Sequence, residues 1–351
     1  MGASIPLAGV LAGLGLVGTL LADLPAVKMI NALGERKAMI LASIVGGVSI
    51  LLSYFAINIF MLGAGILISG SCMAVFGLAR LGLMTEAVPL ERRARALALL
   101  GGTFRAGGFL GPLIGSMIIH FSSVNSVYLM TVVCSLVAGF VLLFSKSSNM
   151  KDTPQNSRHS LWHIAKREQL KLRTLGLSAT ALSISRAART IGLPLWALYI
   201  HLPVSTAALY IGIAGALDFA LFYTSGQVID RFGRKWAAAP TLLGMAISFF
   251  ALCLVHDATG FFIVAIALSL SNALGSGLVM VIGADLAPKD ARNEFLAFFR
   301  LMNDSGQAAT APAISLLTVI FGLPLAMAGM GVIALTGALG MWRHISRFEI
   351  S

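Results

Sequence analysis

The chain has 351 residues, of which 58% are apolar and 11% are charged, and its mean hydropathy is +0.90. Soluble domains are typically about 45–50% apolar and about 25% charged. This composition therefore excludes a soluble enzyme, a disordered protein and a disulfide-rich scaffold. At roughly 20 apolar residues per crossing, the chain has room for about ten to twelve membrane spans. The three cysteines, Cys72, Cys134 and Cys253, lie in apolar stretches without ligand spacing, so we expect no disulfide and no metal site.

Hydropathy predicts membrane-spanning helices separated by short turns along most of the chain. They are expected at residues 4–30, 36–57, 59–85, 94–120, 125–145, 173–199, 205–229, 235–255, 259–285, 293–320 and 323–343. No stretch alternates apolar and polar residues with a period of two, as the strands of a membrane barrel do. We therefore expect an all-α polytopic membrane protein.

Basic residues occur in alternate loops. The loops that carry them contain Lys28, Arg36, Lys37, Arg92, Arg93, Arg95, Arg231, Arg234, Lys235, Lys289, Arg292, Arg343 and Arg347, whereas the turns between those loops have no Lys or Arg. The positive-inside rule places the basic loops and the C-terminus in the cytoplasm. We therefore expect a protein of the plasma (inner) membrane, and we assign the net charge of +11 to topology rather than to nucleic-acid binding.

Residues 146–172 form the one long polar segment. Its start is rich in Ser, Asn and Pro, and its end, from Leu161 to Leu172, is basic and amphipathic. Such a helix is typical of one that lies on an anionic membrane surface. We expect a cytoplasmic linker between an N-terminal bundle, residues 1–145, and a six-helix C-terminal bundle, residues 173–351.

Features of the two halves recur 199 residues apart. Gly34 in LGERKAM corresponds to Gly233 in FGRKWAA, and Glu86, Pro89 and Arg93 correspond to Asp285, Pro288 and Arg292. A shared offset in separate loops indicates two homologous halves, a common arrangement in transporters. The counterpart of the span 173–199 would precede residue 1, which leaves five spans in the first half and six in the second. We therefore expect either a start upstream of Met1 or a truncated chain.

The segment GQVIDRFGRK resembles the cytoplasmic-loop motif of the major facilitator superfamily at each defined position. The matching residues are Gly226, Asp230, Arg231, Gly233, Arg234 and Lys235, and the degraded first-half copy, VKMINALGERK, keeps Gly34, Arg36 and Lys37. The resemblance extends over essentially the whole chain. It implies two pseudo-symmetric helical bundles, with twelve helices in the complete fold, of which the first is missing here.

The motif residues have physical roles that fit such a loop. Gly226 would let two helices approach closely, and Asp230 would accept from a helix N-terminus or an Arg and latch the cytoplasmic face. Gly233 would permit a tight turn, while Arg234 and Lys235 would hold phospholipid headgroups. The alternative is a generic basic turn.

Two charge pairs, Glu86 with Arg93 and Asp285 with Arg292, are expected at the cytoplasmic ends of related spans. They are candidate gating pairs that break when this side opens. The alternative is exposed charges worth under about 1 kcal/mol each.

The segment RAGGFLGPLIG resembles the core of a motif associated in this family with proton-driven antiporters, through Gly107, Gly111, Pro112 and Gly115. Proline removes a helix hydrogen bond and glycines expose backbone, so we expect a kinked, closely packed helix. The corresponding second-half segment, APAIS, lacks the glycines. The resemblance implies drug or metabolite efflux.

Charged residues inside the predicted spans are costly in a bilayer and often functional. They are Asp23, Arg80, Arg105, Arg186, Arg189, Asp218, Arg300 and Asp304. They are candidates for a water-accessible cavity and for proton coupling, Asp218 before Asp304 and Asp23, and Arg80 resembles the family's fourth-helix arginine. The alternative is structural ion pairing between helices, most clearly for Arg300 with Asp304.

The sequence thus predicts a secondary active transporter, with proton-coupled efflux of a small organic molecule by alternating access as the first hypothesis. Five Arg against three Asp within the spans favours an anionic or zwitterionic substrate, so import of an organic anion is an alternative. A truncated, non-transporting protein is another. We expect a monomer in the lipid bilayer whose partners are the substrate and protons, with no cofactor, no enzymatic activity and no nucleic acid.

Overall fold

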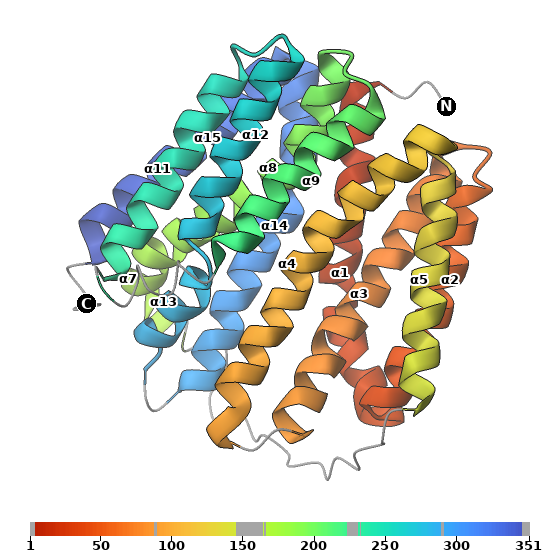
Figure 1. Cartoon of the computed structure of the whole chain (residues 1–351). Helices are drawn as coiled ribbons and strands as arrows, with labels where there is room; N and C mark the ends of the chain where they lie inside the picture. Colours follow the sequence, from red (N-terminus) through yellow and green to blue (C-terminus); the bar gives the residue numbers. More distant parts are fainter. Residues whose placement is uncertain are drawn as a thin grey trace. The chain divides into compact units, whose positions relative to one another are not determined.

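A computed structural model describes residues 4–87, 90–144, 164, 166–222, 231, 233–288 and 291–345. Within these ranges the regular structure is helical and contains no strand (Figure 1). Seven helical segments of the described chain are long and apolar enough to cross a membrane. The predicted all-α class is therefore confirmed.

Packing divides the chain into two compact units, residues 1–107 with 114–154 and residues 108–113 with 155–351. The helices of the first unit are α1 (Ile5–Leu33), α2 (Glu35–Tyr54), α3 (Ile59–Ala87), α5 (Ser126–Phe144) and most of α4 (Leu90–Phe121). The second unit contains α7 (Gln169–Lys171), η1 (Leu172–Gly176), α8 (Leu177–Tyr199), α9 (Val204–Ala220), α11 (Arg234–Leu252), α12 (Ala258–Leu274), α13 (Leu278–Leu286), α14 (Arg292–Phe321) and α15 (Leu323–His344).

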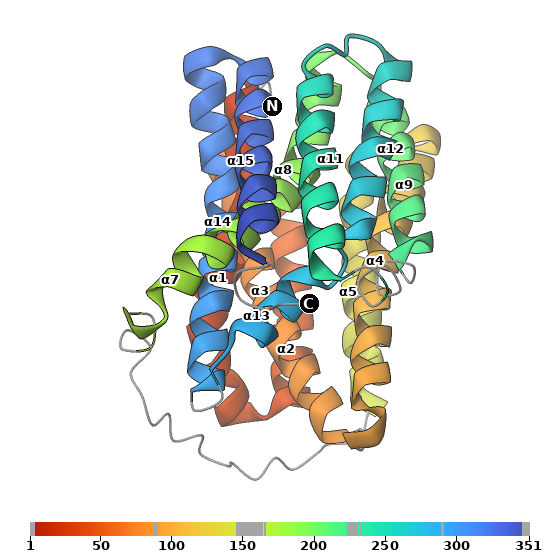
Figure 2. The ribbon, with the colours of Figure 1, turned by 90° about the vertical axis from the view of Figure 1, so that its left-hand side faces the viewer.

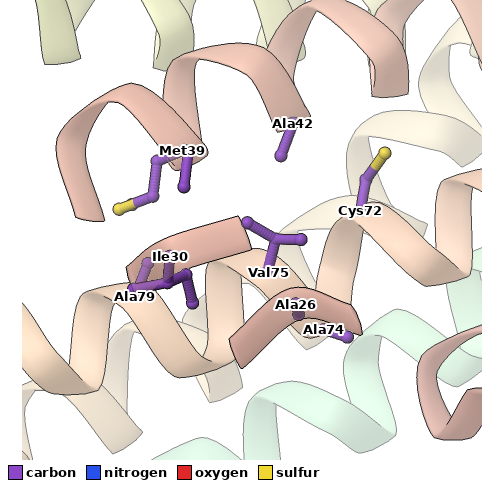
Figure 3. Packing of buried hydrophobic residues seen from close by; sticks show 9 residues of the cluster. Ala26, Ile30, Met39, Ala42, Cys72, Ala74, Val75 and Ala79 are labelled. Atoms are coloured by element: carbon purple, nitrogen blue, oxygen red, sulfur yellow. The ribbon is translucent and has the colours of Figure 1, made fainter. Parts of the chain in front are cut away.

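Small side chains let the helices of the first unit pack closely. In this unit α3 packs against α1 and α2, and α2 packs against α5. Figure 3 shows the buried cluster between them, which includes Ala26, Ala42, Cys72, Ala74 and Ala79. Apolar burial does not drive helices together in lipid, so close backbone approach through small residues supplies much of the contact energy.

The second unit repeats this packing. There α12 packs against α9 and α11, and α11 packs against α15, and each of these helices lies about 199 residues after its first-unit counterpart. Gly34 and Gly233 adopt nearly the same backbone conformation, with φ of 78° and 83°. Only glycine adopts this region without strain. The internal repeat of the sequence therefore extends to the structure of each unit.

One predicted span is interrupted. Residues 259–285, expected as one crossing, form α12 and α13 with a turn at Gly275–Gly277 between them (Figure 2). Gly277 has a φ of +75°, which favours glycine over residues with a side chain. Hydropathy does not reveal this break because the turn residues are small and lie in an apolar stretch. The predicted span 205–229 is also shorter as described, since α9 ends at Ala220 and residues 223–230 lie outside the described residues.

Candidate functional site

Three of the charged residues predicted within the spans come together in the second unit. Arg186 and Arg189 lie one turn apart on α8, and Asp218 lies near the end of α9. Ser269 and Asn272 of α12 join them. We call these five residues the polar cluster.

Asp218 is the acidic member of the polar cluster and is buried, with 9% of its side chain exposed. Its Oδ2 accepts a hydrogen bond from Asn272 Nδ2 at 2.8 Å and lies 3.4 Å from a terminal guanidinium nitrogen of Arg189. The other terminal nitrogen of Arg189 donates to Ser269 Oγ at 3.0 Å. The carboxylate is thus held by one cation and one amide from two different helices.

Arg186 connects the polar cluster to the helix break. Its Nε donates to Asn272 Oδ1 at 3.0 Å, and a terminal nitrogen donates to the carbonyl oxygen of Gly275 at 2.6 Å. Carbonyls at the end of a helix lack an intrahelical partner. The Gly275 carbonyl also accepts from the backbone N–H of Leu278 at 3.2 Å, so Arg186 adds a second hydrogen bond at the turn where α12 ends.

The polar cluster carries an unequal number of charges. Arg186, Arg189 and Asp218 are the only charged residues in the sequences of α8, α9 and α12. These three helices thus carry two arginines and one carboxylate in otherwise uncharged sequences. The arrangement is suited to bind an additional anionic group or to change when Asp218 takes a proton.

Sequence reasoning found the three charged members and missed Ser269 and Asn272. The available signal was Asn272, the only amide in the predicted span 259–285. A second missed contact links α8 with α14, where Ser183 Oγ donates to Asn303 Oδ1 at 2.8 Å. Neutral polar residues within spans often hydrogen-bond between helices.

Arg300 and Asp304 form the i,i+4 ion pair that their spacing predicts, with Nε and Oδ2 3.2 Å apart. Both lie on α14, and the Arg300 side chain is more than half exposed. This pair does not contribute to the described contacts of the polar cluster.

The predicted charges of the first unit do not form a comparable described cluster. The guanidinium carbon of Arg80 lies 3.3 Å from the centre of the Phe104 ring, a cation–π contact between α3 and α4. Among described residues, the buried Nε of Arg80 has no hydrogen-bond partner. Asp23 and Arg105 are both partly buried. Glu86 and Arg93 lie in helices, but their side chains are outside the described part of the chain.

The loop-motif cations contact the ends of helices. Arg36 Nε donates to the carbonyl oxygen of Leu142 at 2.9 Å, and its guanidinium also bonds the carbonyl of Leu143 at the end of α5. The Lys235 ammonium lies 4.1 Å from the centre of a Trp342 ring at the end of α15. Both pairs of positions are related by the 199-residue offset. Each cation therefore connects equivalent helices, α2 with α5 in the first unit and α11 with α15 in the second.

Asp285 forms its described ion pair with Arg234, whose Nε lies 3.1 Å from Oδ2. The side chain of Arg292, the predicted partner of Asp285, is not among the described side chains. Gly226 and Asp230 lie outside the described residues. Arg231 and Lys37 are exposed.

The glycines of the antiporter-like segment have open space around them. A methyl group at Gly107, Gly111 or Gly115 would meet no described atom within 4 Å. The helix continues through Pro112. The close packing expected at these glycines is therefore not seen among the described residues.

The model of the family described as the Major Facilitator Superfamily matches residues 1–283 and 175–350. No curated protein sequence matches the chain.

Solved structures share its fold at low identity. The inward-open xylose transporter XylE from E. coli has a TM-score of 0.75 at 15% identity, with 98% of this chain and 87% of that chain covered. A bacterial homologue of the human lysosomal transporter Spinster, inward-facing and unoccupied, has a TM-score of 0.78 at 14% identity, covering 99% and 90%. A POT family transporter in complex with 5-aminolevulinic acid has a TM-score of 0.78 at 11% identity, covering 99% and 89%.

Proposed function

Because the chain belongs to the Major Facilitator Superfamily, as its loop motif predicts, we propose that its polar cluster couples the transport of a small organic molecule to the movement of protons. The chain is a multi-pass membrane protein with the fold of secondary transporters that work by alternating access.

The observation that supports proton coupling is the Asp218–Arg189 pair. In this proposal, the Asp218 carboxylate, which is 9% exposed and paired across two helices, keeps the ion pair when it is charged and loses it when it takes a proton. Contacts between α8 and α9 then differ in the two states. A protonation that changes the contacts between helices is the kind of two-state element that coupling needs.

Two directions of transport have separate support. Export in exchange for protons is favoured by the resemblance of Gly107, Gly111, Pro112 and Gly115 to the antiporter motif. Uptake of an organic anion is favoured by the charge of the polar cluster. We further propose a monomer in the plasma membrane with a cytoplasmic linker and C-terminus, on the distribution of Lys and Arg.

Proteoliposomes containing the full chain and a pH-sensitive dye test proton coupling. Candidate solutes are added outside, and proton entry or exit is recorded. Asp218→Asn keeps the shape but cannot take a proton, so we expect solute-dependent proton flux to fall at least about tenfold, the size of a moderate coupling free energy. Asp257→Asn is the matched control, since Asp257 caps α12 at an exposed turn outside the polar cluster. Wild-type proton flux in the Asp218 variant would contradict the proposal.

A further inference from the structure

We infer that Lys235, Trp236, Trp342 and Arg343 bind the headgroup of an anionic phospholipid at the end of the second unit where α11 begins and α15 ends. We call these four residues the headgroup site. The headgroup site lies outside the polar cluster and does not depend on the proposed proton coupling. A lipid bound there contacts both helices and stabilises their packing.

Two exposed tryptophans mark the membrane interface at this end of the helices. Trp236 is the third residue of α11, and Trp342 is the third residue from the end of α15. Both helices are long and apolar enough to cross a membrane, and they pack against each other (Figure 2). The two rings meet edge to face with their centres 5.5 Å apart, and the residues are 58% and 45% exposed. Tryptophans at the ends of spans typically lie at the level of the lipid headgroups.

Two cations adjoin the tryptophans, and neither helix carries an acidic residue. The Lys235 ammonium lies 4.1 Å from the centre of a Trp342 ring, and the exposed Arg343 follows in the last turn of α15. The sequences of α11 and α15 contain no Asp or Glu. Asp285 of α13 forms its described ion pair with Arg234. The ammonium donors of Lys235 that point away from the ring are therefore placed to bond phosphate oxygens.

The first unit uses its equivalent cation differently. Arg36, which lies 199 residues before Lys235, donates to the carbonyl oxygen of Leu142 at the end of α5. The first-unit counterparts of the two tryptophans are a lysine and a leucine. The packing of these helices thus needs neither an aromatic pair nor a cation above it. The second unit therefore carries a surface feature that the fold alone does not explain.

An exposed apolar strip continues along both helices from the tryptophans. On α11 it contains Leu243 and Ile247, seven and eleven residues after Trp236, which are 45% and 59% exposed. On α15 it contains Leu339, three residues before Trp342, which is 62% exposed. These spacings place each residue on the same face of its helix as the tryptophan. The surface thus matches a phospholipid from headgroup to acyl chain, whereas a water-soluble anion would contact only the charged end.

The charge of the headgroup site distinguishes classes of lipid. In the topology that the basic loops predict, this end of the spans faces the cytoplasm, and the cytoplasmic leaflet carries anionic lipids. Phosphatidylglycerol keeps the net negative charge of its phosphate, whereas phosphatidylcholine brings a second cation close to Lys235 and Arg343. Each Lys or Arg near an anionic lipid strengthens binding about fivefold. Phosphatidylglycerol should therefore bind more tightly than phosphatidylcholine.

Thermal unfolding of the full chain in maltoside micelles tests the inference. The micelles are titrated with phosphatidylglycerol or with phosphatidylcholine of the same acyl chains, and glycerol 3-phosphate at equal total concentration is the water-soluble probe. A ligand that binds the folded state raises the unfolding temperature saturably. We expect phosphatidylglycerol to do so with an apparent affinity at least about tenfold above that of phosphatidylcholine. Glycerol 3-phosphate should cause no shift.

Variants separate the charges of the headgroup site from its rings. Lys235→Gln and Arg343→Gln should each weaken phosphatidylglycerol binding about fivefold, and the double variant should bind the two lipids alike. Trp342→Leu should weaken the binding of both lipids, and Trp342→Phe, which keeps a ring, should fall between it and the wild type. Lys28→Gln is the matched control, because Lys28 is an exposed lysine of α1 in the first unit, and it should keep the wild-type preference.

Equal affinity of the wild type for the two lipids would overturn the inference, and so would a preference for phosphatidylglycerol that survives in the double variant. If Lys28→Gln loses as much of the preference as Lys235→Gln, the lipids respond to overall charge and the headgroup site is refuted. Binding of glycerol 3-phosphate as tight as that of the lipid would also refute it, because the site would then recognise a soluble phosphate. Proton flux in liposomes tests the proposed function separately from each of these results.

Discussion

Asn272 lies between the two kinds of charge in the polar cluster, and its amide is oriented by both. The oxygen accepts from Arg186 while the nitrogen donates to Asp218. The opposite orientation would place the amide nitrogen against a guanidinium and the oxygen against a carboxylate, which removes the hydrogen bond that each charged group makes with Asn272. Asn272 thus links Arg186 to Asp218 by hydrogen bonds without adding a charge.

Glu168 provides a pH-dependent contact outside the membrane-spanning helices. Burial raises the pKa of its carboxyl, but hydrogen bonds and charge from Lys171, at 2.8 Å, and Arg167, at 3.1 Å, outweigh this and hold the pKa below its ordinary value of 4.5. A lowered pKa means that the stabilisation is present above the ordinary value and is lost as the pH falls through the lowered one.

We therefore expect the amides of residues 169–172 to exchange hydrogen faster, relative to the intrinsic rate, once the pH falls below that of the folded-state titration. The loss should be under about 1 kcal/mol, because the Lys171 and Arg167 side chains are 30% and 37% exposed. Hydrogen exchange read by mass spectrometry measures it. Glu168→Gln should show no such pH dependence, and the same dependence in this variant would contradict the assignment.

At the scale of helices, α13 is a nine-residue segment held at both ends. Arg186 bonds the carbonyl of Gly275 before it begins. At its other end Asp285 pairs with Arg234, and Lys171 Nζ donates to the carbonyl oxygen of Leu286 at 3.3 Å. The end contacts are partly exposed and individually weak. The backbone conformation of the turn at Gly275–Gly277 therefore determines the direction of α13 relative to α12.

Replacing Gly277 by alanine should destabilise the chain through its backbone alone. No described atom lies within 4 Å of an added methyl group, so the cost comes from a φ of +75° and should be about 1–2 kcal/mol. Thermal unfolding of the purified chain measures it, and Gly277→Asn should lose less. Gly77→Ala is the matched control, since it is equally open but lies within α3 and should be neutral or slightly stabilising. Equal effects at the two glycines would refute a conformational role for Gly277.

Over the whole chain, the sequence predicts the helices and the individual charged residues within them. It does not predict that Arg186, Arg189 and Asp218 lie together. The helix positions and the repeat follow from apolar runs and a constant offset. Arg186, Arg189 and Asp218 are visible because a charge in an apolar run is unusual. Their contact depends on how α8, α9 and α12 pack, and the break beside Gly275 depends on a turn that does not lower hydropathy. Local patterns carry neither kind of information.

The two repeats differ where the polar cluster lies. Asp218 and Ser269 correspond, 199 residues earlier, to Thr19 and Gly70. In the first unit Thr19 Oγ1 donates to the carbonyl oxygen of Gly70 at 2.9 Å. The side chain that Ser269 directs towards Arg189 has no counterpart at Gly70. The equivalent helix pairs thus make different contacts at these positions. In the first unit α1 and α3 meet through backbone atoms, whereas in the second unit α9 and α12 meet through charged and polar side chains.

This difference predicts that alanine at the two equivalent positions affects different properties of the protein. A methyl group at Gly70 would overlap the carbonyl oxygen and Cα of Gly15, and backbone atoms of α1 do not move aside as a flexible side chain does. Gly70→Ala should therefore separate α1 from α3, cost about 1–3 kcal/mol or more and reduce the folded yield. Ser269→Ala adds no atoms, so its yield should stay near wild type, while loss of the bond to Arg189 should alter solute-dependent proton flux. Size-exclusion chromatography and the liposome assay measure both. A Gly70 variant that folds like the wild type would mean that α1 and α3 do not meet at these glycines.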